Sequence, residues 1–214
     1  MTAAGRCVRD GHFPVPRPFV PGFEASGRVV AVGEGVERDR VGEHVIALTG
    51  SDGFAEVVVA PSVPAIAAPG VDARTAAAFG RVTSTAYDLI NTVAGVRPGQ
   101  NVLVHAAAGG VGTLAVRFAR AAGAGRVVGV VGDPGQVGYA RQAGYDQVLG
   151  REEFPHALGG ERVDVILDPS AARPGRPTWN AWRRTAGSRS TATSPPPSRS
   201  PPRSTTCRRR GRRC

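Results

Sequence analysis

Apolar and polar positions follow two different patterns along this chain. Between residues 18 and 61, short apolar runs rich in Val, Ile and Phe are separated by glycine turns, a pattern typical of a compact β-barrel. We therefore expect a barrel domain over residues 1–72. Its predicted strands are residues 27–32, 43–48 and 54–59.

The second pattern begins with a helical segment over residues 73–95, which Gly95 and Pro98 end. From residue 101, continuous apolar runs alternate with helical segments, which predicts a parallel sheet with crossover helices. The fold class is therefore α/β, with an incomplete dinucleotide-binding domain over residues 73–170. The predicted strands are residues 101–106, 126–131, 146–150 and 162–168, and the helices are residues 109–123 and 135–144.

A glycine-rich turn, AAAGGVG, separates the first of these strands from the first helix. Against the dinucleotide fingerprint G-x-G-x-x-G, Ala107, Gly109 and Gly112 take the three glycine positions. These positions make the tight turn, admit the pyrophosphate and let the helix pack closely on the strand. A tight turn without a ligand is the alternative. The candidate cofactor-binding residues of this turn are Ala107, Ala108, Gly109, Gly110, Val111 and Gly112.

The end of the second strand bears on the choice of dinucleotide. NAD sites place an acid there for the ribose 2′-hydroxyl, whereas this strand ends in Val131. Gly132, Asp133 and Gln136 follow and are further candidates for cofactor contact. Asp133 has two open interpretations, as a ribose ligand or as a turn residue beside Pro134.

Longer motifs resemble a known family. PFVPGFEASGRVVAVGEGV resembles the P-G-x-E-x-x-G-x-V segment of medium-chain dehydrogenase/reductases. STAYDLI and PGQNVLVHAAAGGVG resemble their zinc-independent quinone oxidoreductase (zeta-crystallin-like) branch. The resemblance implies a partial GroES-like β-barrel before an incomplete Rossmann domain, and hydride transfer from NADPH to a quinone or α,β-unsaturated carbonyl. It also places Thr85 near the nicotinamide, with helix packing beside Tyr87 as the alternative role.

The resemblance also bears on metal and cofactor. GRCVRD, with Cys7, resembles the segment that bears the first zinc ligand of alcohol dehydrogenases. The positions of the next two ligands hold Phe23 and Arg81, and zinc needs about three protein ligands, so we expect no zinc. Where this branch grips the 2′-phosphate with a basic residue, the chain has the uncharged Gln136. The missing acid at Val131 still disfavours NADH, so we expect NADPH.

The charge of the chain is unevenly distributed. The formal net charge is +10, yet residues 171–214 hold 12 Arg and no acid, and the remaining residues hold 15 Arg against all 17 acids. The segment 171–214 has no aliphatic residue beyond Ala, so we expect a disordered tail. Because its only aromatic residues are Trp179 and Trp182, we do not expect specific nucleic-acid recognition. Phosphate neutralisation by the tail, on nucleic acid or acidic partners, stays an alternative function.

Both ends depart from the family pattern. We expect an N-terminal truncation and a reading-frame shift near the C-terminus, which makes an inactive remnant a further alternative. The family is usually homo-oligomeric, but the pairing strands are missing here, and the strand at 162–168 is expected to have an exposed edge. No apolar run is long enough to span a membrane, no signal-like stretch opens the chain, and Cys7, Cys207 and Cys214 form no disulfide framework. We expect a cytoplasmic protein.

Overall fold

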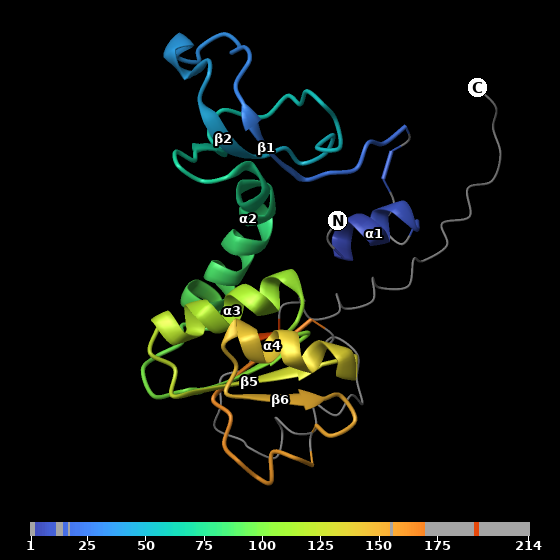
Figure 1. The fold of residues 1–214 in the computed structure, drawn as a ribbon, viewed down its shortest axis with the longest axis vertical. Coiled ribbons are helices and arrows are strands. Elements are labelled where there is room, and N and C mark those ends of the chain that lie inside the picture. Colours follow the sequence, from blue (N-terminus) through green and yellow to red (C-terminus); the bar gives the residue numbers. More distant parts are fainter. Residues whose placement is uncertain (1–2, 12–14, 17, 155, 170–190, 193–214) are drawn as a thin grey trace, which may run out of the picture.

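The computed structural model describes residues 3–11, 15–16, 18–154, 156–169 and 191–192 (Figure 1). The strands form two sheets, one antiparallel and one parallel, and the helix α2 lies between them. The antiparallel sheet has the order β1-β2-β3 and consists of β1 (Glu24–Arg28), β2 (His44–Leu48) and β3 (Ala65–Ala67). The parallel sheet has the order β6-β5-β4-β7-β8 and consists of β4 (Asn101–His105), β5 (Arg126–Val131), β6 (Gln147–Gly150), β7 (Val165–Asp168) and β8 (Thr191–Ala192).

Helices connect and cover these strands. The α-helices are α1 (Ala3–Arg9), α2 (Ala73–Tyr87), α3 (Gly110–Ala121) and α4 (Val137–Ala143). Two 3₁₀ turns, η1 (Arg38–Arg40) and η3 (Pro134–Gln136), and a π-helical segment, η2 (Asp88–Val93), complete the described elements. The α/β class is confirmed. The domain boundary that we expected at residue 72 stays a prediction.

The antiparallel sheet differs from its predicted strands. The predicted strand at 43–48 is present as β2, and the one at 27–32 is displaced toward the N-terminus as β1. The prediction at 54–59 is wrong, because β2 pairs with β3 instead. Residues 52–54 are held outside the sheet, since their backbone N–H groups donate to the carbonyls of Val20, Gly22 and Pro21 at 2.9–3.0 Å.

Helix α2 begins at a good cap and packs against the antiparallel sheet. The Asp72 carboxylate accepts hydrogen bonds from the backbone N–H groups of Arg74 and Thr75 at 3.1 and 3.0 Å. A Cβ on Gly80 would lie 2.7 Å from Glu24 Oε2 and 3.3 Å from Ile46 Cγ2, so the helix approaches the side chains of β1 and β2 closely at this glycine.

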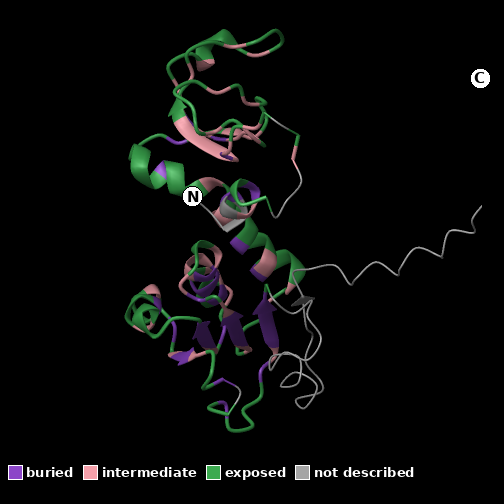
Figure 2. Ribbon diagram, turned by 90° about the vertical axis from the view of Figure 1, so that its right-hand side faces the viewer, coloured by how far each residue is buried: buried purple, intermediate pink, exposed green. Residues whose placement is uncertain are grey.

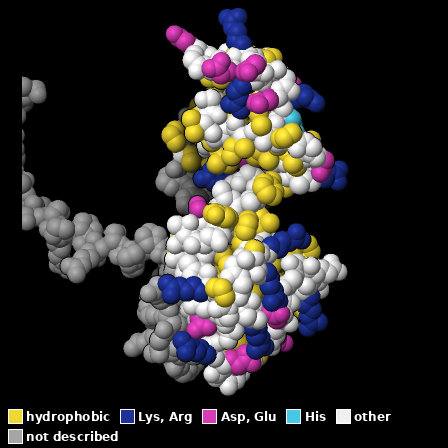
Figure 3. All heavy atoms as spheres, turned by 90° about the vertical axis from the view of Figure 1, so that its left-hand side faces the viewer, with side chains coloured by type: hydrophobic (Ala, Val, Ile, Leu, Met, Phe, Trp, Pro, Cys, Tyr) yellow, Lys and Arg dark blue, Asp and Glu magenta, His cyan; other side chains and the backbone are white. Residues whose placement is uncertain are grey.

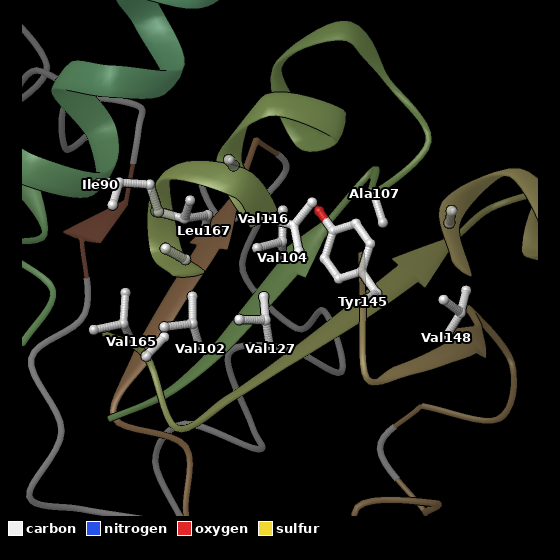
Figure 4. Packing of buried hydrophobic residues seen from close by; sticks show 14 of the residues in the cluster. Ile90, Val102, Val104, Ala107, Val116, Val127, Tyr145, Val148, Val165 and Leu167 are labelled. Carbon is white, nitrogen blue, oxygen red and sulfur yellow. The ribbon is translucent and has the colours of Figure 1, made fainter. Parts of the chain in front are cut away.

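The parallel sheet carries the larger core, and four of its five strands match predicted strands, whereas β8 lies in the segment that we expected to be disordered. Leu103 of β4 pairs with Val128 of β5 and with Ile166 of β7, which places β4 at the centre. One face packs against α3, α4 and η2 in a cluster that Figure 4 shows from close by. Its labelled members are Ile90, Val102, Val104, Ala107, Val116, Val127, Tyr145, Val148, Val165 and Leu167. Figure 2 shows the contrast between these buried strands and the more exposed antiparallel sheet.

The other face of the parallel sheet is covered by the chain between β6 and β7. Phe154, Leu158 and Val163 from this connection join Leu103, Val128, Val130, Leu149 and Ile166 in a second buried cluster. No helix covers this face within the described residues, so a non-helical connection performs that role.

Strand β7 is less exposed than we predicted. Leu167 and Asp168 pair with Thr191 and Ala192 of β8, and every residue of β7 is buried. The predicted open edge is therefore wrong along these two residues. The rest of the expected disordered tail, residues 171–190 and 193–214, lies outside the described residues.

Candidate functional site

The glycine-rich turn connects β4 to α3 at the carboxyl edge of the parallel sheet. Ala107 N–H donates to the carbonyl of Val130 in β5 at 3.0 Å, and Gly109 N–H donates to the carbonyl of Ala106 at 2.8 Å. These bonds close the turn and join it to the neighbouring strand. The turn therefore lies at the edge where the carboxyl ends of β4 and β5 meet.

Gly112 is the residue that lets α3 approach this turn. A Cβ at Gly112 would lie 2.5 Å from the carbonyl oxygen of Ala106 and 2.7 Å from that of Ala107. No side chain fits at such distances, so the helix packs this closely only with glycine. This is the close helix–strand packing for which the fingerprint reserves its third glycine.

The tight turn falls one residue earlier than the fingerprint assignment predicted. Ala106 has a φ of 53°, in the left-handed region, whereas we assigned the turn position to Ala107. Ala107 is instead fully buried. A Cβ added to Gly129 of β5 would lie 2.8 Å from the Cβ of Ala107. The contact explains why glycine stands at 129, opposite the methyl group of Ala107.

The start of α3 offers backbone donors to an anion. Gly109 is the N-cap, without a side-chain cap, and both Gly109 and Gly110 are exposed. The carbonyl of Gly109 accepts from Thr113 Oγ1 at 2.8 Å, which fixes the first helical turn. An exposed helix N-terminus with uncapped N–H groups and no side chains in the way favours a bound phosphate.

The residues after β5 lie exposed at the same edge. Asp133 is the N-cap of η3, and its Oδ1 accepts from Gly135 N–H at 2.9 Å. This geometry corresponds to one of the two interpretations of Asp133, that of a turn residue. A contact of Asp133 with the ribose stays a prediction. Gly132 and Gln136 are also exposed, and neither brings a charge to the site.

Thr85 comes to this edge on α2. A Cβ on Gly110 would lie 3.3 Å from Val82 Cγ1, so α2 runs directly beside the glycine-rich turn. Thr85 lies about one helical turn after Val82 and is exposed. Its hydroxyl donates to the carbonyl of Arg81 at 2.8 Å and keeps its capacity to accept. Nearby, Tyr87 packs edge-on against Phe118 of α3, with ring centroids 5.5 Å apart.

The two positions that zinc ligands would take contact each other. The guanidinium of Arg81 lies over the ring of Phe23, 5.2 Å from its centroid, in a cation–π arrangement. The backbone N–H of Arg81 donates to the carboxylate of Glu24. Among the described residues, no group of three His, Cys, Asp or Glu side chains is arranged to hold a metal ion.

The connection between α4 and β6 contacts the start of α3, next to the glycine-rich turn. The Tyr145 hydroxyl donates to the carbonyl of Gly112 at 2.7 Å, and burial raises the pKa of Tyr145 well above its ordinary value. Beside it, Asp146 accepts from Val127 N–H at 2.6 Å and pairs with Arg120. Burial by itself would raise the pKa of Asp146. The bonds to Arg120 and to Val127 N–H outweigh this effect and hold the pKa below its ordinary value.

Sequence reasoning missed three residues here. Ala106 carried no signal, because an alanine in the left-handed region is unusual. Tyr145 could have been flagged as an aromatic residue directly after the helical segment, next to the sheet. Arg151 could have been found from its place immediately after the third parallel strand, at the same edge as the glycine-rich turn.

Comparison with known proteins agrees with this geometry. Residues 1–70 match the family model of the alcohol dehydrogenase GroES-like domain, and residues 110–180 match that of the zinc-binding dehydrogenase. The chain belongs to the medium-chain dehydrogenase/reductase superfamily. It is 36% identical over 183 residues to a quinone oxidoreductase of Salmonella typhimurium, a match over 81% of this chain and 54% of that protein.

Solved structures of quinone oxidoreductases are similar as well. The Escherichia coli enzyme complexed with NADPH has a TM-score of 0.73 and 31% identity, over 84% of this chain and 56% of that one. The Pseudomonas syringae pv. tomato enzyme also has a TM-score of 0.73, with 30% identity over 86% and 58%. This chain spans about half the length of the relatives it matches. The fold is thereby confirmed as a GroES-like domain followed by a Rossmann-like parallel sheet.

The described surface says less about possible partners. Figure 3 shows arginine and acidic side chains interspersed over the described face that it views. No helix in the described part of the chain has the length and apolar character to cross a bilayer. The basic segment 171–214 lies almost wholly outside the described residues, so contacts of this segment with nucleic acid stay a prediction. Oligomer pairing and a cytoplasmic location also stay predictions.

Proposed function

We propose that this chain forms the dinucleotide-binding part of a zinc-free, NADPH-dependent oxidoreductase that reduces a quinone or an α,β-unsaturated carbonyl. The observation that carries the proposal is the close contact of Gly112 with the Ala106–Ala107 turn, 2.5 Å from an added Cβ to the Ala106 oxygen. That contact is the packing a dinucleotide fingerprint requires, and it brings a side-chain-free helix start to the edge of the sheet.

The residues present fit a dinucleotide. The exposed backbone of Gly109 and Gly110 leaves space for a pyrophosphate to approach the N–H groups at the start of α3. Ala107, Ala108 and Val111 complete the turn that holds those donors in place. Gly132, Asp133 and Gln136 lie at the end of β5, where a ribose would be bound.

The chemistry of the reaction belongs to the nicotinamide, which supplies a hydride when it is bound. The chain's own residues bind and orient the cofactor and the acceptor. Thr85, on the helix beside the glycine-rich turn, has a free acceptor lone pair for a polar group of the ligand. The contact of Arg81 with Phe23 supports a reaction without zinc, because neither side chain ligates the metal.

The acceptor class is proposed from the relatives. The Salmonella typhimurium protein is named a quinone oxidoreductase, and the similar Escherichia coli structure is complexed with NADPH. A quinone or an enone is an electrophile that accepts a hydride at carbon or oxygen without a metal. Both therefore suit a site that works by orientation.

Titration of the purified full chain with NADPH, followed by nicotinamide fluorescence, tests the cofactor site. We expect saturable binding that Gly109→Val abolishes, because a branched side chain at the N-cap would occupy the phosphate position. Gly138→Val is the matched control, since Gly138 is exposed with nothing within 4 Å of an added Cβ. Absence of saturable binding by the folded chain would overturn the proposal.

Turnover is tested separately, by the loss of NADPH absorbance with a simple quinone and a simple enone. Oxidation that depends on the acceptor supports the full proposal. Binding of NADPH without oxidation by either acceptor would contradict the reaction and favour the inactive remnant. Zinc added to or removed from the assay is expected to change neither rate.

A further inference from the structure

An arginine side chain lies at the end of β5. It comes from the residue after β6, whereas sequence reasoning looked for a basic residue at the position of Gln136. If a Cβ were placed on Gly132, it would lie 3.1 Å from Nη2 and 3.6 Å from Cζ of Arg151. Arg151 immediately follows β6, the strand that pairs with β5 in parallel. Its guanidinium therefore lies against the backbone directly after Val131, the last residue of β5.

The turn that carries Arg151 is held at both sides. The Glu153 carboxylate accepts from Gly150 N–H at 2.9 Å, and Phe154 N–H donates to the carbonyl of Gly150 at 3.1 Å. Phe154 is buried and packs edge-on against the ring of His105, with centroids 5.0 Å apart. Arg151 thus extends from a fixed turn toward Gly132.

The charge of Arg151 is available to a ligand. Within the residues that the structure describes, its guanidinium takes part in no ion pair, and the side chain is exposed. Nearby carboxylates have other partners: Asp133 accepts from Gly135 N–H, and Glu153 accepts from Gly150 N–H. Glu152, the next residue along the chain, is exposed.

We propose that Arg151 binds the 2′-phosphate of NADPH and selects this cofactor over NADH. This inference rests on the proposed function. In a dinucleotide fold the adenosine ribose lies at the end of the second strand, and an arginine near that point accommodates the 2′-phosphate. Guanidinium donors match phosphate oxygens in pairs, which a neutral Gln136 cannot do. Arg151 supplies the charge that the position of Gln136 lacks.

The test compares ligands that differ only in the 2′-phosphate. NADPH and NADH are titrated by fluorescence, and adenosine 2′,5′-bisphosphate and 5′-AMP by calorimetry, with the full chain and with Arg151→Gln. We expect the variant to weaken binding of the two 2′-phosphorylated ligands roughly 10- to 100-fold, as for loss of a charged hydrogen-bond partner. Binding of NADH and 5′-AMP should stay within the error of the wild type, and Arg151→Lys should be intermediate.

Arg141→Gln is the matched control, because Arg141 is also exposed but lies on α4. Equal weakening of all four ligands by Arg151→Gln would assign the residue a structural role and overturn the inference. So would unchanged NADPH binding in a variant with wild-type thermal stability. A wild-type chain that binds NADH as tightly as NADPH overturns the inference and leaves the dinucleotide site standing, whereas a chain that binds neither dinucleotide overturns the proposed function itself.

Discussion

The hydroxyl of Tyr145 donates a 2.7 Å hydrogen bond to the carbonyl oxygen of Gly112, and both residues are buried. Tyr145 comes from the connection between α4 and β6, and Gly112 from the first turn of α3. On its other side, Gly112 touches the Ala106–Ala107 turn. The start of α3 is therefore fixed between the strand edge and a buried tyrosine, which Figure 4 shows with its oxygen directed at the helix.

Removing this hydroxyl tests its contribution. We expect Tyr145→Phe to lower the free energy of unfolding by about 1 kcal/mol, the net value of a typical buried hydrogen bond. A larger loss is not expected, because a carbonyl inside a helix also accepts an intrahelical bond. Urea unfolding measures the effect, with Tyr139→Phe as control, since Tyr139 is 56% exposed. An equal effect of the two substitutions would contradict a special role for Tyr145.

A methyl group on Gly112 should be at least as damaging as the loss of the hydroxyl. Gly112→Ala places a Cβ 2.5 Å from the Ala106 oxygen, so the helix or the turn must move. We expect a loss of about 1–3 kcal/mol in the free energy of unfolding, as for overpacking in a core. Gly138→Ala, in the open space of α4, should instead stabilise the chain slightly, because alanine favours a helix. Thermal unfolding of both variants would show opposite shifts; a neutral Gly112→Ala would rule out the close contact.

The parallel sheet could be predicted from the sequence because its strands are continuous apolar runs. NVLVH and RVVGVV are buried along nearly their whole length, and a glycine turn and an amphipathic helix separate them. Such a pattern has few other solutions, and all four strands predicted after residue 100 are present.

The antiparallel sheet was harder, since backbone hydrogen bonds in loops decide its strands. Val57 and Val59 suggested a strand by composition, yet they are 69% and 92% exposed. Residues 65–67, within a proline-rich stretch, form β3, and Arg40 Nη2 donates to the Ala65 carbonyl at 2.6 Å there. Long-range contacts of this kind leave no periodic signal in the sequence. Arg151 was missed although its place after the third predicted parallel strand was visible in the sequence, because its proximity to Gly132 depends on the pairing of β5 with β6.

Asp146 should contribute a pH-dependent part of the stability. Its pKa is lower in the folded chain than its ordinary value, because Arg120 and Val127 N–H bind the charged form against the cost of burial. The folded state therefore binds its proton less readily than the unfolded state does. The contribution is complete above the ordinary pKa of an aspartate and is lost as the pH falls through the lowered pKa.

Thermal melts from neutral to acidic pH measure this contribution. Asp146→Asn should lower the melting temperature at neutral pH and make it fall less steeply in acid. Asp39→Asn, an exposed aspartate, is the control and should leave the profile unchanged. A wild-type profile that is as shallow as that of Asp146→Asn would show that this carboxylate has no such role.

The contact of Arg81 with Phe23 leads to a prediction about zinc. A guanidinium 5.2 Å from the ring centroid places a fixed positive charge where a metal ligand would be needed. We therefore expect the purified chain to contain less than stoichiometric zinc by elemental analysis, and a chelator to leave its melting temperature unchanged. Cys7→Ser should not alter the metal content, because a single thiol does not make a zinc site. One zinc ion per chain that survives dialysis, falls on Cys7→Ser and stabilises the fold would show that Cys7 is a zinc ligand and would contradict the prediction.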